Sequence, residues 1–535
     1  MRREQRFWGW GEPGAGPALP EHAPALLREW LGISGDVVAH PPALADVTLP
    51  DPVLAPPLRA ALAHAVGAEH VRDDHATRVL RAAGKSYLDL LALRSGTPAA
   101  APDAVVAPGS AAAVRAVLDA CAEHGAAVIP FGGGTSVVGG VAPERGAFPT
   151  AVCLDLGRLD ALLDVDTRSR TVRVGPGLRL PELEHALAPH GLRLGHVPQS
   201  YEWATVGGCA ATRSAGQASA GVGRFEALVA ALRCTTPAGE LATRDAPASA
   251  AGPDLRALVL GSEGTLGVIS ELTLRVRPVA AESRYAAWLF RSFTAGCEAL
   301  RTLAQAGAAP DVARLSDADE TRTTLALAGG GALQTAGLGA LGFRPGSLLV
   351  CGWEGDADRV RRRRRAARGA LRHALPLGSG AGAAWRAARF AGPHLRDALI
   401  DRGVLVETLE TATTWTRLPA LHAAVRAALE TALAATPPVV GCHVSHVYPD
   451  GASLYVTVFA RADAEDPAGQ WRAAKRAAGD AIAATGATIT HHHAVGTDHR
   501  PWMEAEHGAL GIDVLRALKA RCDPAGVMNP GKLLP

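Results

Sequence analysis

A glycine-rich turn follows directly on a short apolar run, and it constrains the fold more than any other stretch of the chain. Residues 126–140 read AAVIPFGGGTSVVGG. Three successive glycines leave no Cβ atoms between the backbone N–H groups and an approaching anion, so the turn can form a nest for a diphosphate. Thr135 and Ser136 add hydroxyl donors there. Taken alone, the same letters also suit an ordinary turn, so the neighbouring elements have to decide.

The segment before the turn predicts a strand, a helix and a second strand. Residues 104–107 are apolar, and Pro108-Gly109-Ser110 follows, with Ser110 placed to cap a helix. Apolar residues at 114, 117, 118 and 121 share one helical face, and Gly125 stands where the helix should end. The second strand runs into the glycines without a Gly-Lys-Ser/Thr sequence or GxGxxG spacing. Neither a Walker loop nor a Rossmann dinucleotide fingerprint is present, so a different cofactor fold is required.

Composition limits the class of protein. A chain of 535 residues exceeds what one core usually organises, so we expect two or more domains. With 48% hydrophobic and 20% charged residues it is typical of a soluble globular protein, and its net charge of +2 is too small for a bulk nucleic-acid binder. The eight cysteines include no CxxC pair, which favours free thiols in a reducing compartment. No signal peptide or membrane-spanning run is visible, so we expect a cytoplasmic protein, with contact to a bilayer surface left open.

Three further segments carry a family resemblance. Residues 194–208 read LGHVPQSYEWATVGG, 211–216 read ATRSAG and 261–269 read GSEGTLGVI. In this order and spacing they resemble the FAD-binding, PCMH-type domain of the vanillyl-alcohol-oxidase and p-cresol-methylhydroxylase superfamily. The resemblance implies bound FAD, with the diphosphate in the glycine turn. It implies cofactor contacts from Pro130, Phe131, Gly132, Gly133, Gly134, Thr135, Ser136, Pro198, Gln199, Ser200, Tyr201, Glu202, Trp203, Ala204, Thr205, Ala211, Thr212, Ser214, Glu263, Gly264, Thr265, Leu266, Gly267, Val268 and Ile269.

The resemblance also implies a fold class and a division of the chain. We expect an α+β protein with a two-lobed PCMH-type FAD-binding domain at 96–280 and an α+β cap domain for the substrate at 281–490. Helical patches near 23–31 and 57–66 predict a helical and irregular N-terminal segment over 1–95, and residues 491–535 should return to the flavin. In the cap, residues 291–304, 358–374 and 418–435 look helical, whereas 347–352 and 452–460 look like strands.

Two patterns in the second region do not point to a site. Residues 337–342, GLGALG, match GxGxxG literally but have no strand before them, so we interpret them as a loop. Residues 361–365 are five arginines on a predicted helix. A solvated helix face is the default interpretation of such a run, and attraction to anionic lipid headgroups is the functional alternative.

Three consecutive histidines, His491, His492 and His493, follow a probable strand at 486–490. On a strand at most two of them can share a face. Catalytic imidazoles and a chance polar run are both open interpretations, because histidine titrates near neutrality. A metal site would need ligands from elsewhere, and no HxxxH or Cys/His spacing supplies them, so we expect no metal.

A narrower resemblance bears on these histidines. RFWGWG at 6–11 and HHHAVG at 491–496 are similar to segments of the alkyldihydroxyacetonephosphate synthases, where the family motif reads HHHGVG. By this resemblance the three histidines are required for activity, and Arg396, in the segment 393–397, contacts the substrate phosphate. The acid/base tyrosine is Tyr455, with Tyr448 the competing assignment, and Arg213 lies near the cofactor. Residues 522–532 resemble the superfamily's closing motif.

The resemblance implies an FAD-dependent alkylglycerone-phosphate synthase that exchanges the acyl group of acyl-dihydroxyacetone phosphate for a long-chain alcohol through a flavin N5 adduct, a step of ether lipid biosynthesis. The FAD should be noncovalent, because the turn offers no histidine to attach it, and we expect a homodimer. The alternative is an FAD-dependent oxidoreductase, an oxidase or dehydrogenase of 2-hydroxy acids such as D-lactate or glycolate. A flavoprotein kept only for binding is disfavoured, because all the presumed reactive residues are present.

Overall fold

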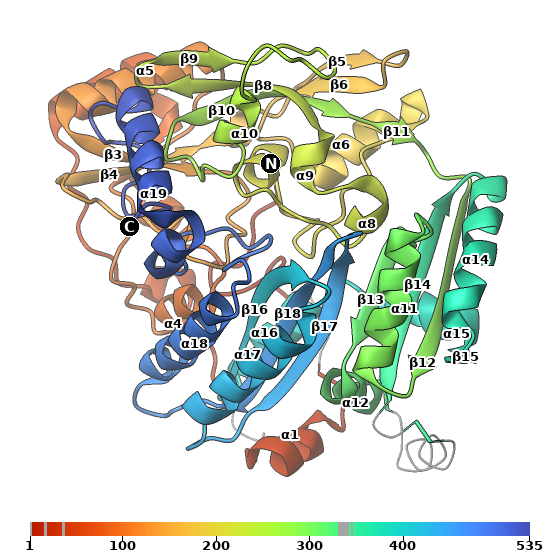
Figure 1. Cartoon of the computed structure of the whole chain (residues 1–535). Helices are drawn as coiled ribbons and strands as arrows, with labels where there is room; N and C mark the ends of the chain where they lie inside the picture. The colour runs from red at the N-terminus through yellow and green to blue at the C-terminus, as the bar shows by residue number, and fades with distance from the viewer. Residues whose placement is uncertain (1–2, 15–18, 35–37, 330–341, 344–345) are drawn as a thin grey trace.

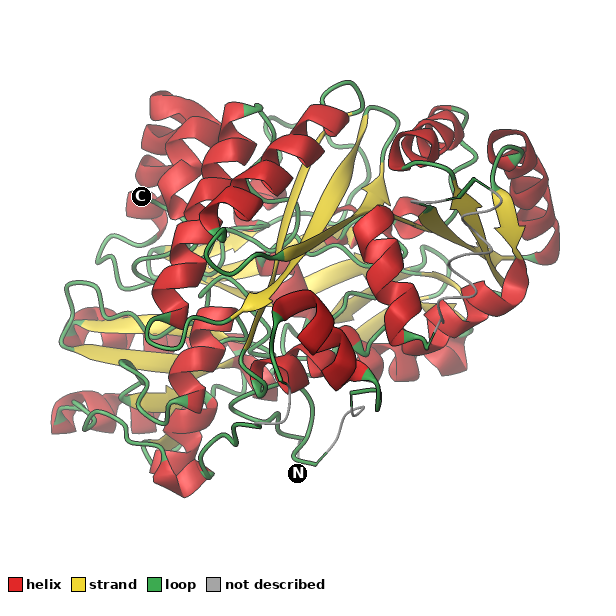
Figure 2. Ribbon diagram, turned by 90° about the horizontal axis from the view of Figure 1, so that it is seen from below, coloured by secondary structure: helices red, strands yellow, loops and turns green. Residues whose placement is uncertain are grey.

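The computed structural model describes residues 3–14, 19–34, 38–329, 342–343 and 346–535 (Figure 1). Most of the GLGALG segment lies outside these residues. Strands form one four-stranded, one five-stranded and one seven-stranded sheet, with a small pair between β7 (Leu192–Arg193) and β11 (Arg277–Pro278). Figure 2 shows helices flanking the long strands. The mixture of helix and antiparallel sheet confirms the predicted α+β class.

The four-stranded sheet ends in the glycine turn. β2 and β3 each pair in parallel with β4 between them, and α5 (Ala111–His124) connects β2 to β3. Ser110 accepts the N–H of Ala113, and Gly125 adopts the left-handed conformation that ends the helix, with φ 64°. The predicted strand, helix and strand are therefore confirmed. The strands are β1 (Val71–Arg72), β2 (Ala104–Val106), β3 (Ala126–Phe131) and β4 (Thr150–Asp155).

The five-stranded sheet, ordered β5-β6-β10-β8-β9, is antiparallel. The EGTLGVI segment leads into β10, which lies at its centre. Its strands are β5 (Leu162–Asp166), β6 (Thr171–Val174), β8 (Val229–Thr236), β9 (Gly239–Ala242) and β10 (Val268–Arg275), with helices α6 (Leu180–Leu187), α7 (Val206–Ala211), α8 (Ser219–Val222), α9 (Phe225–Leu228) and α10 (Leu255–Val259).

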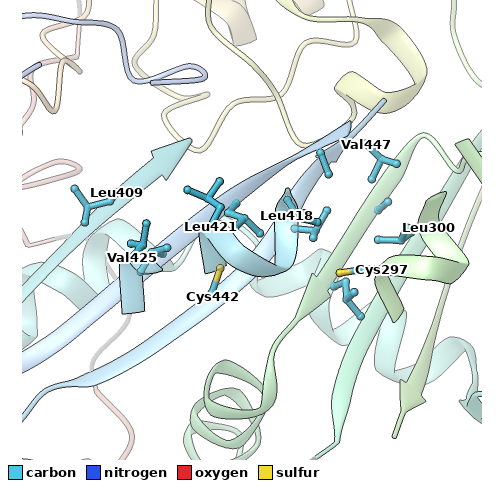
Figure 3. Packing of buried hydrophobic residues seen from close by; sticks show 14 of the residues in the cluster. Cys297, Leu300, Leu409, Leu418, Leu421, Val425, Cys442 and Val447 are labelled. Carbon is cyan, nitrogen blue, oxygen red and sulfur yellow. The ribbon is translucent and has the colours of Figure 1, made fainter. Parts of the chain in front are cut away.

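The seven-stranded sheet takes all its strands from residues 282–461 and is antiparallel throughout, in the order β15-β12-β14-β13-β17-β18-β16. One face is covered by helices whose buried side chains, among them Leu300, Leu421 and Val425, meet Leu409 and Cys442 from the strands (Figure 3). The strands are β12 (Glu282–Phe290), β13 (Val312–Ser316), β14 (Ser347–Gly355), β15 (Leu375–Leu377), β16 (Val404–Thr414), β17 (Val439–Val447) and β18 (Gly451–Arg461), and the helices are α11 (Phe293–Gln305), α12 (Ala318–Leu327), α14 (Ala357–Leu371), α15 (Gly378–Ala388), α16 (Gly392–Ile400), α17 (Leu418–Ala432) and α18 (Pro467–Ala484).

Segments near both ends of the chain contact the four-stranded sheet or the glycine turn that follows it. After α19, residues 527–529 form hydrogen bonds on both sides of Val128 in β3: Val128 N donates to Val527 O, and Asn529 N donates to Val128 O. At the other end, Gln5 Nε2 donates to Gly133 O at 2.9 Å. No helix in the described part of the chain is long and apolar enough to cross a bilayer. The terminal helices are α1 (Ala23–Leu31), α2 (Pro56–Val66), α3 (His75–Leu80), α4 (Tyr87–Arg94) and α19 (Met503–Cys522).

All eight cysteines are buried and unpaired, as the sequence predicts. Burial raises the pKa of Cys121, Cys209 and Cys234 to about 12, so few thiolates form at pH 8. We expect fewer than about one thiol per chain to react with Ellman's reagent in the folded protein. All eight should react in guanidinium chloride. Rapid reaction of several thiols before unfolding would contradict the buried positions.

Candidate active site

The glycine turn packs against the backbone of a second segment so closely that side chains are excluded. A Cβ on Gly133 would lie 2.1 Å from the carbonyl oxygen of Trp203, and one on Gly132 would lie 2.5 Å from Thr205 Oγ1. Gly134 has φ 65°, a conformation that glycine adopts without strain. The glycines are therefore required by close backbone approach, and the turn and residues 203–205 form one rigid unit.

The backbone donors of this turn suit an anion. Among the described residues, the N–H groups of residues 133–136 donate to no protein acceptor. Four consecutive free N–H groups, together with the half-buried Thr135 and Ser136, form a donor set of the kind that binds a diphosphate. The donor set and the glycine cradle fit the FAD that the sequence predicts.

The EGTLGVI segment joins the turn to the C-terminal loops. Glu263 is buried, and its two carboxylate oxygens accept the N–H groups of Val495 and Gly496, both at 2.8 Å. Burial raises its pKa to about 7. Asn529 Nδ2 donates to the carbonyls of Glu263 (2.7 Å) and Gly140 (3.2 Å). One carboxylate and one amide therefore hold the predicted cofactor segments against the histidine loop.

The predicted cofactor segment at 198–205 has two different environments. Trp203 is buried, with the guanidinium groups of Arg3 and Arg179 over its ring at 5.3 and 4.8 Å. By contrast, Gln199 Nε2 donates to Arg389 O, and Tyr201 stacks on Phe390 with ring centroids 5.9 Å apart. Glu202 is exposed. The first part of this segment thus contacts the region between α15 and α16, whereas the second part contacts the glycine turn.

The three histidines lie on a loop around a buried carboxylate, and the predicted strand at 486–490 is wrong. Glu410 of β16 accepts the backbone N–H groups of His491, His492 and His493 at 2.8–2.9 Å. It also accepts the hydroxyl of Thr490 at 2.6 Å. Residues 486–490 form one isolated bridge, between Thr488 and Ala412 of β16, and no strand. The next three N–H groups converge on one carboxylate, so all three imidazoles can join one cluster.

The aromatic rings of this cluster pack against one another. The ring centroids of His491 and His492 lie 5.2 Å apart, those of His492 and His493 4.9 Å apart, and that of Tyr455 5.5 Å from His493 and 6.1 Å from His492. Burial lowers the pKa of His493 to about 3 and that of His491 well below 6.5. Burial alone would raise the pKa of Glu410, but the neighbouring histidines, His492 above all, hold it well below 4.5. Glu410 is therefore a buried carboxylate anion within the imidazole cluster.

Both candidate tyrosines reach the cluster. Tyr455 of β18 donates to Thr408 Oγ1 at 3.2 Å, whereas the Tyr448 hydroxyl lies 2.6 Å from His491 Nε2. Burial raises the pKa of each phenol to about 12. The two tyrosines therefore sit at different places in the cluster, Tyr455 beside His492 and His493 and Tyr448 beside His491.

Several residues of the site carry no signal in the sequence. His446 stacks on His491 with ring centroids 5.0 Å apart, because a bulge between Val444 and Val447 of β17 shifts the register. His443 stacks on Tyr455 at 4.9 Å, and its Nδ1 lies 2.8 Å from Glu320. Glu410, which organises the loop, is one of several polar residues in its strand and stands out only once the histidines are seen around it.

The two predicted arginines have different surroundings. Arg396 of α16 is buried, with Nη2 donating to Lys85 O at 2.6 Å and Nη1 3.3 Å from Glu407 Oε1. Its Nε is buried and has no partner among the described residues. Glu407 in turn accepts the N–H of Thr408 at 2.8 Å, so Arg396 connects to Tyr455 through two residues. Arg213 has a half-exposed side chain 3.7 Å from Glu226 and a left-handed backbone, with φ 50°.

Replacing Gly133 with alanine should release FAD. The new Cβ would meet the Trp203 carbonyl at 2.1 Å, so the two backbones must separate and the anion nest distort. We expect flavin occupancy, measured as the absorbance ratio at 450 and 280 nm after desalting, to fall about tenfold or more. Gly369→Ala in α14 is the matched control, because its Cβ would meet nothing within 4 Å. Equal flavin content in the two variants would contradict the role of the turn.

Comparisons with known proteins agree with this geometry. Residues 102–244 match a family model described as an FAD binding domain, and residues 279–533 match the C-terminal domain of FAD linked oxidases. The chain is 30% identical over 505 residues to the alkyldihydroxyacetonephosphate synthase of Trypanosoma brucei brucei, covering 91% of this chain and 82% of that protein. It is 31% identical to the Dictyostelium discoideum enzyme of the same name, covering 87% and 79%. A solved alkyldihydroxyacetonephosphate synthase superposes with a TM-score of 0.85 at 27% identity over 99% of both chains.

Proposed function

Because this chain belongs to the alkyldihydroxyacetonephosphate synthase family, we propose that it forms the ether bond of alkyl-dihydroxyacetone phosphate by exchanging the acyl group of acyl-dihydroxyacetone phosphate for a long-chain alcohol. It is an FAD-dependent enzyme. One observation of the structure carries the proposal: the cluster of His491, His492, His493 and Tyr455 is tied by Glu263 to the segments that hold the cofactor. When bound, FAD supplies an electron-accepting ring that no protein side chain offers.

The exchange needs a group that passes protons. The alcohol loses its O–H proton and the acyl group leaves as a carboxylate, so one proton is released overall. We assign this role to Tyr455 Oη, because the rings of His492 and His493 lie beside the phenol and Thr408 accepts its hydrogen bond.

The substrate phosphate is assigned to Arg396. Its guanidinium is held in place by Lys85 O and Glu407, and no described residue pairs with its buried Nε. The hydrogen-bonded residues Glu407 and Thr408 join it to Tyr455, so an anion bound there would be positioned relative to the phenol. This supports the phosphate role, which fixes the end of the substrate that does not react.

The function is tested by anaerobic incubation with palmitoyl-dihydroxyacetone phosphate and hexadecanol, in parallel with D-lactate or glycolate. We expect the ether product by mass spectrometry, one carboxylate released for each ether formed, and an oxidised flavin spectrum at the end. Stoichiometric bleaching by a hydroxy acid without ether product would replace the proposal with the oxidase or dehydrogenase alternative.

The attachment of FAD, the location and the oligomeric state are further proposals. We propose that FAD is noncovalent, because residues 131–136 contain no histidine or cysteine, and flavin in the pellet after acid precipitation would refute it. Eight buried free thiols favour the reducing cytoplasm, which cell fractionation tests. We also propose that the enzyme is a homodimer, and light scattering of the purified chain tests this by measuring its mass in solution.

We also propose that α14 contacts an anionic bilayer surface. Its run of five arginines is helical, as predicted. Arg363 pairs with Asp311 and Arg361 with Asp358, whereas Arg365 and Arg368 are exposed and form no ion pair with any described residue. Two cavities open beside the helix, and arginines line both. The cavity of about 370 Å³ also includes Glu282, and the cavity of about 240 Å³ includes the rings of Trp288 and Trp353. These cations complement the charge of a headgroup layer.

Reversing two of these charges should weaken vesicle binding. Each arginine near an anionic surface contributes about 1 kcal/mol, so Arg365→Glu/Arg368→Glu should lower the partition coefficient for phosphatidylserine-containing vesicles by roughly tenfold or more at low salt. Arg472→Glu/Arg476→Glu on α18 has the same charge change on a different helix and is the control. Sedimentation of vesicles gives the measurement. Equal losses in both variants would show only a general charge effect and contradict a specific surface.

A further inference from the structure

Three imidazoles from two distant segments, two of them buried and one partly buried, converge in this site. His446 comes from β17, and His491 and His492 come from the loop around Glu410. Their candidate ligand nitrogens all lie within 4.8 Å of one another. From sequence, adjacent histidines offer at most two ligands on one face, whereas the β17 bulge brings the third to the same place.

Two ring nitrogens of this group are within hydrogen-bond distance of each other. His491 Nδ1 and His492 Nδ1 lie 3.0 Å apart. Two nitrogens bound to one zinc ion at about 2.0–2.1 Å each would be separated by about 3.3 Å. His446 Nδ1 is buried and has no partner among the described residues. A buried imidazole nitrogen without a partner, on a ring packed against two other imidazoles, is explained by a bound ligand.

The surroundings supply the supporting groups of a metal site. His491 Nε2 lies 2.6 Å from the Tyr448 hydroxyl, so this outer hydrogen bond can fix the ring with Nδ1 free to coordinate. Glu410 Oε1 accepts four donors, whereas Oε2 accepts the His491 N–H and lies 3.2 Å from His492 Nδ1. The carboxylate therefore places a buried negative charge beside the three nitrogens, where it compensates the charge of a cation.

We propose that His446, His491 and His492 bind one divalent transition-metal ion of the zinc class. Three imidazoles that leave one coordination position open form a donor set that suits zinc better than magnesium or calcium. The remaining position is available to Glu410 Oε2 or to a water molecule. This assignment divides the histidine triplet: His491 and His492 are ligands, and His493 stays beside Tyr455 for proton transfer.

The test measures metal content and does not depend on ether synthesis. Tag-free holoprotein is stripped with a chelator, incubated with excess zinc chloride, gel-filtered and analysed by mass spectrometry for zinc. We expect about one zinc per chain for the wild type and at least tenfold less for His446→Ala. His422→Ala on α17, which removes a histidine bonded to Asp317 outside the cluster, should retain the wild-type content.

A second measurement keeps the result interpretable if His446→Ala folds poorly. Zinc should raise the melting temperature of the wild type and of His422→Ala, because an ion that binds only the folded chain stabilises it. It should not raise that of His446→Gln, which keeps a polar side chain of similar size. Wild-type protein that holds no more zinc than His446→Ala, or that melts at the same temperature with and without zinc, overturns the proposal. Ether synthesis is assayed separately, so a negative zinc result leaves the proposed function undecided by this experiment.

Discussion

Replacing Tyr455 with phenylalanine should lower the rate of ether formation by about 10²- to 10⁴-fold, the usual contribution of a positioned acid/base, while leaving FAD bound. Among the described residues the phenol hydroxyl bonds to Thr408 alone, and its ring packs between His443 and the histidine loop. Phenylalanine fills the same slot, so only the proton-carrying oxygen is lost. Product formation by mass spectrometry and flavin absorbance at 450 nm give the two measurements.

Tyr448→Phe is the matched control, because it removes the other phenol of the cluster. It breaks the hydrogen bond to His491 Nε2 but leaves Tyr455 in place. We expect a smaller loss of rate than for Tyr455→Phe. Full activity of Tyr455→Phe with a large loss in Tyr448→Phe would transfer the acid/base role to Tyr448, the competing assignment from the sequence.

Replacing Glu410 with alanine should open the histidine loop and destabilise the protein. Three backbone N–H groups and the Thr490 hydroxyl would lose their acceptor, and each buried unsatisfied donor costs about 1–3 kcal/mol. Partial solvation of the opened loop reduces the sum, and we expect a loss of about 4 kcal/mol or more in unfolding free energy. Glutamine keeps one carbonyl oxygen toward these donors, so Glu410→Gln should lose less unfolding free energy than Glu410→Ala.

Hydrogen exchange measures this effect at the donors themselves. The amides of His491, His492 and His493 should exchange slowly in the wild type, faster in Glu410→Gln and fastest in Glu410→Ala. The melting temperature should fall along the same series, from the wild type to Glu410→Gln to Glu410→Ala. Glu240→Ala, which removes an exposed carboxylate paired with Arg233, should change neither measurement appreciably. Slow exchange at the three histidines in Glu410→Ala would show that another group holds the loop.

The strand, helix and strand before the glycine turn could be predicted in detail because its signals are local. Ser110 caps the helix, Gly125 ends it, and the apolar spacing selects its buried face, all within 15 residues or so of one another. The α+β cap was predictable for the same reason, since strands such as β14 and helices such as α17 carry their own periodicity.

The strand before the histidines was predicted wrongly because its competitor is remote in sequence. Residues 486–490 have strand-like composition, but the acceptor for the next three N–H groups is Glu410, about 80 residues earlier. Local propensity is worth only tenths of a kcal/mol per residue, whereas several charge-assisted hydrogen bonds to one buried carboxylate outweigh it. The position of His446 beside this loop could not be predicted either, because it depends on a bulge in β17.

The sequence by itself determined that this chain binds FAD, belongs to the ether-forming branch of its superfamily and carries Tyr455 and three histidines late in the chain, because those conclusions rest on motifs that are contiguous. Only the tertiary structure decided that one carboxylate turns all three histidines into a single cluster, that both tyrosines reach it, and that a fourth imidazole completes a possible set of metal ligands. The physical reason is that a site assembled by hydrogen bonds across tens of residues leaves no periodic trace in the chain, whereas a turn or a helix does.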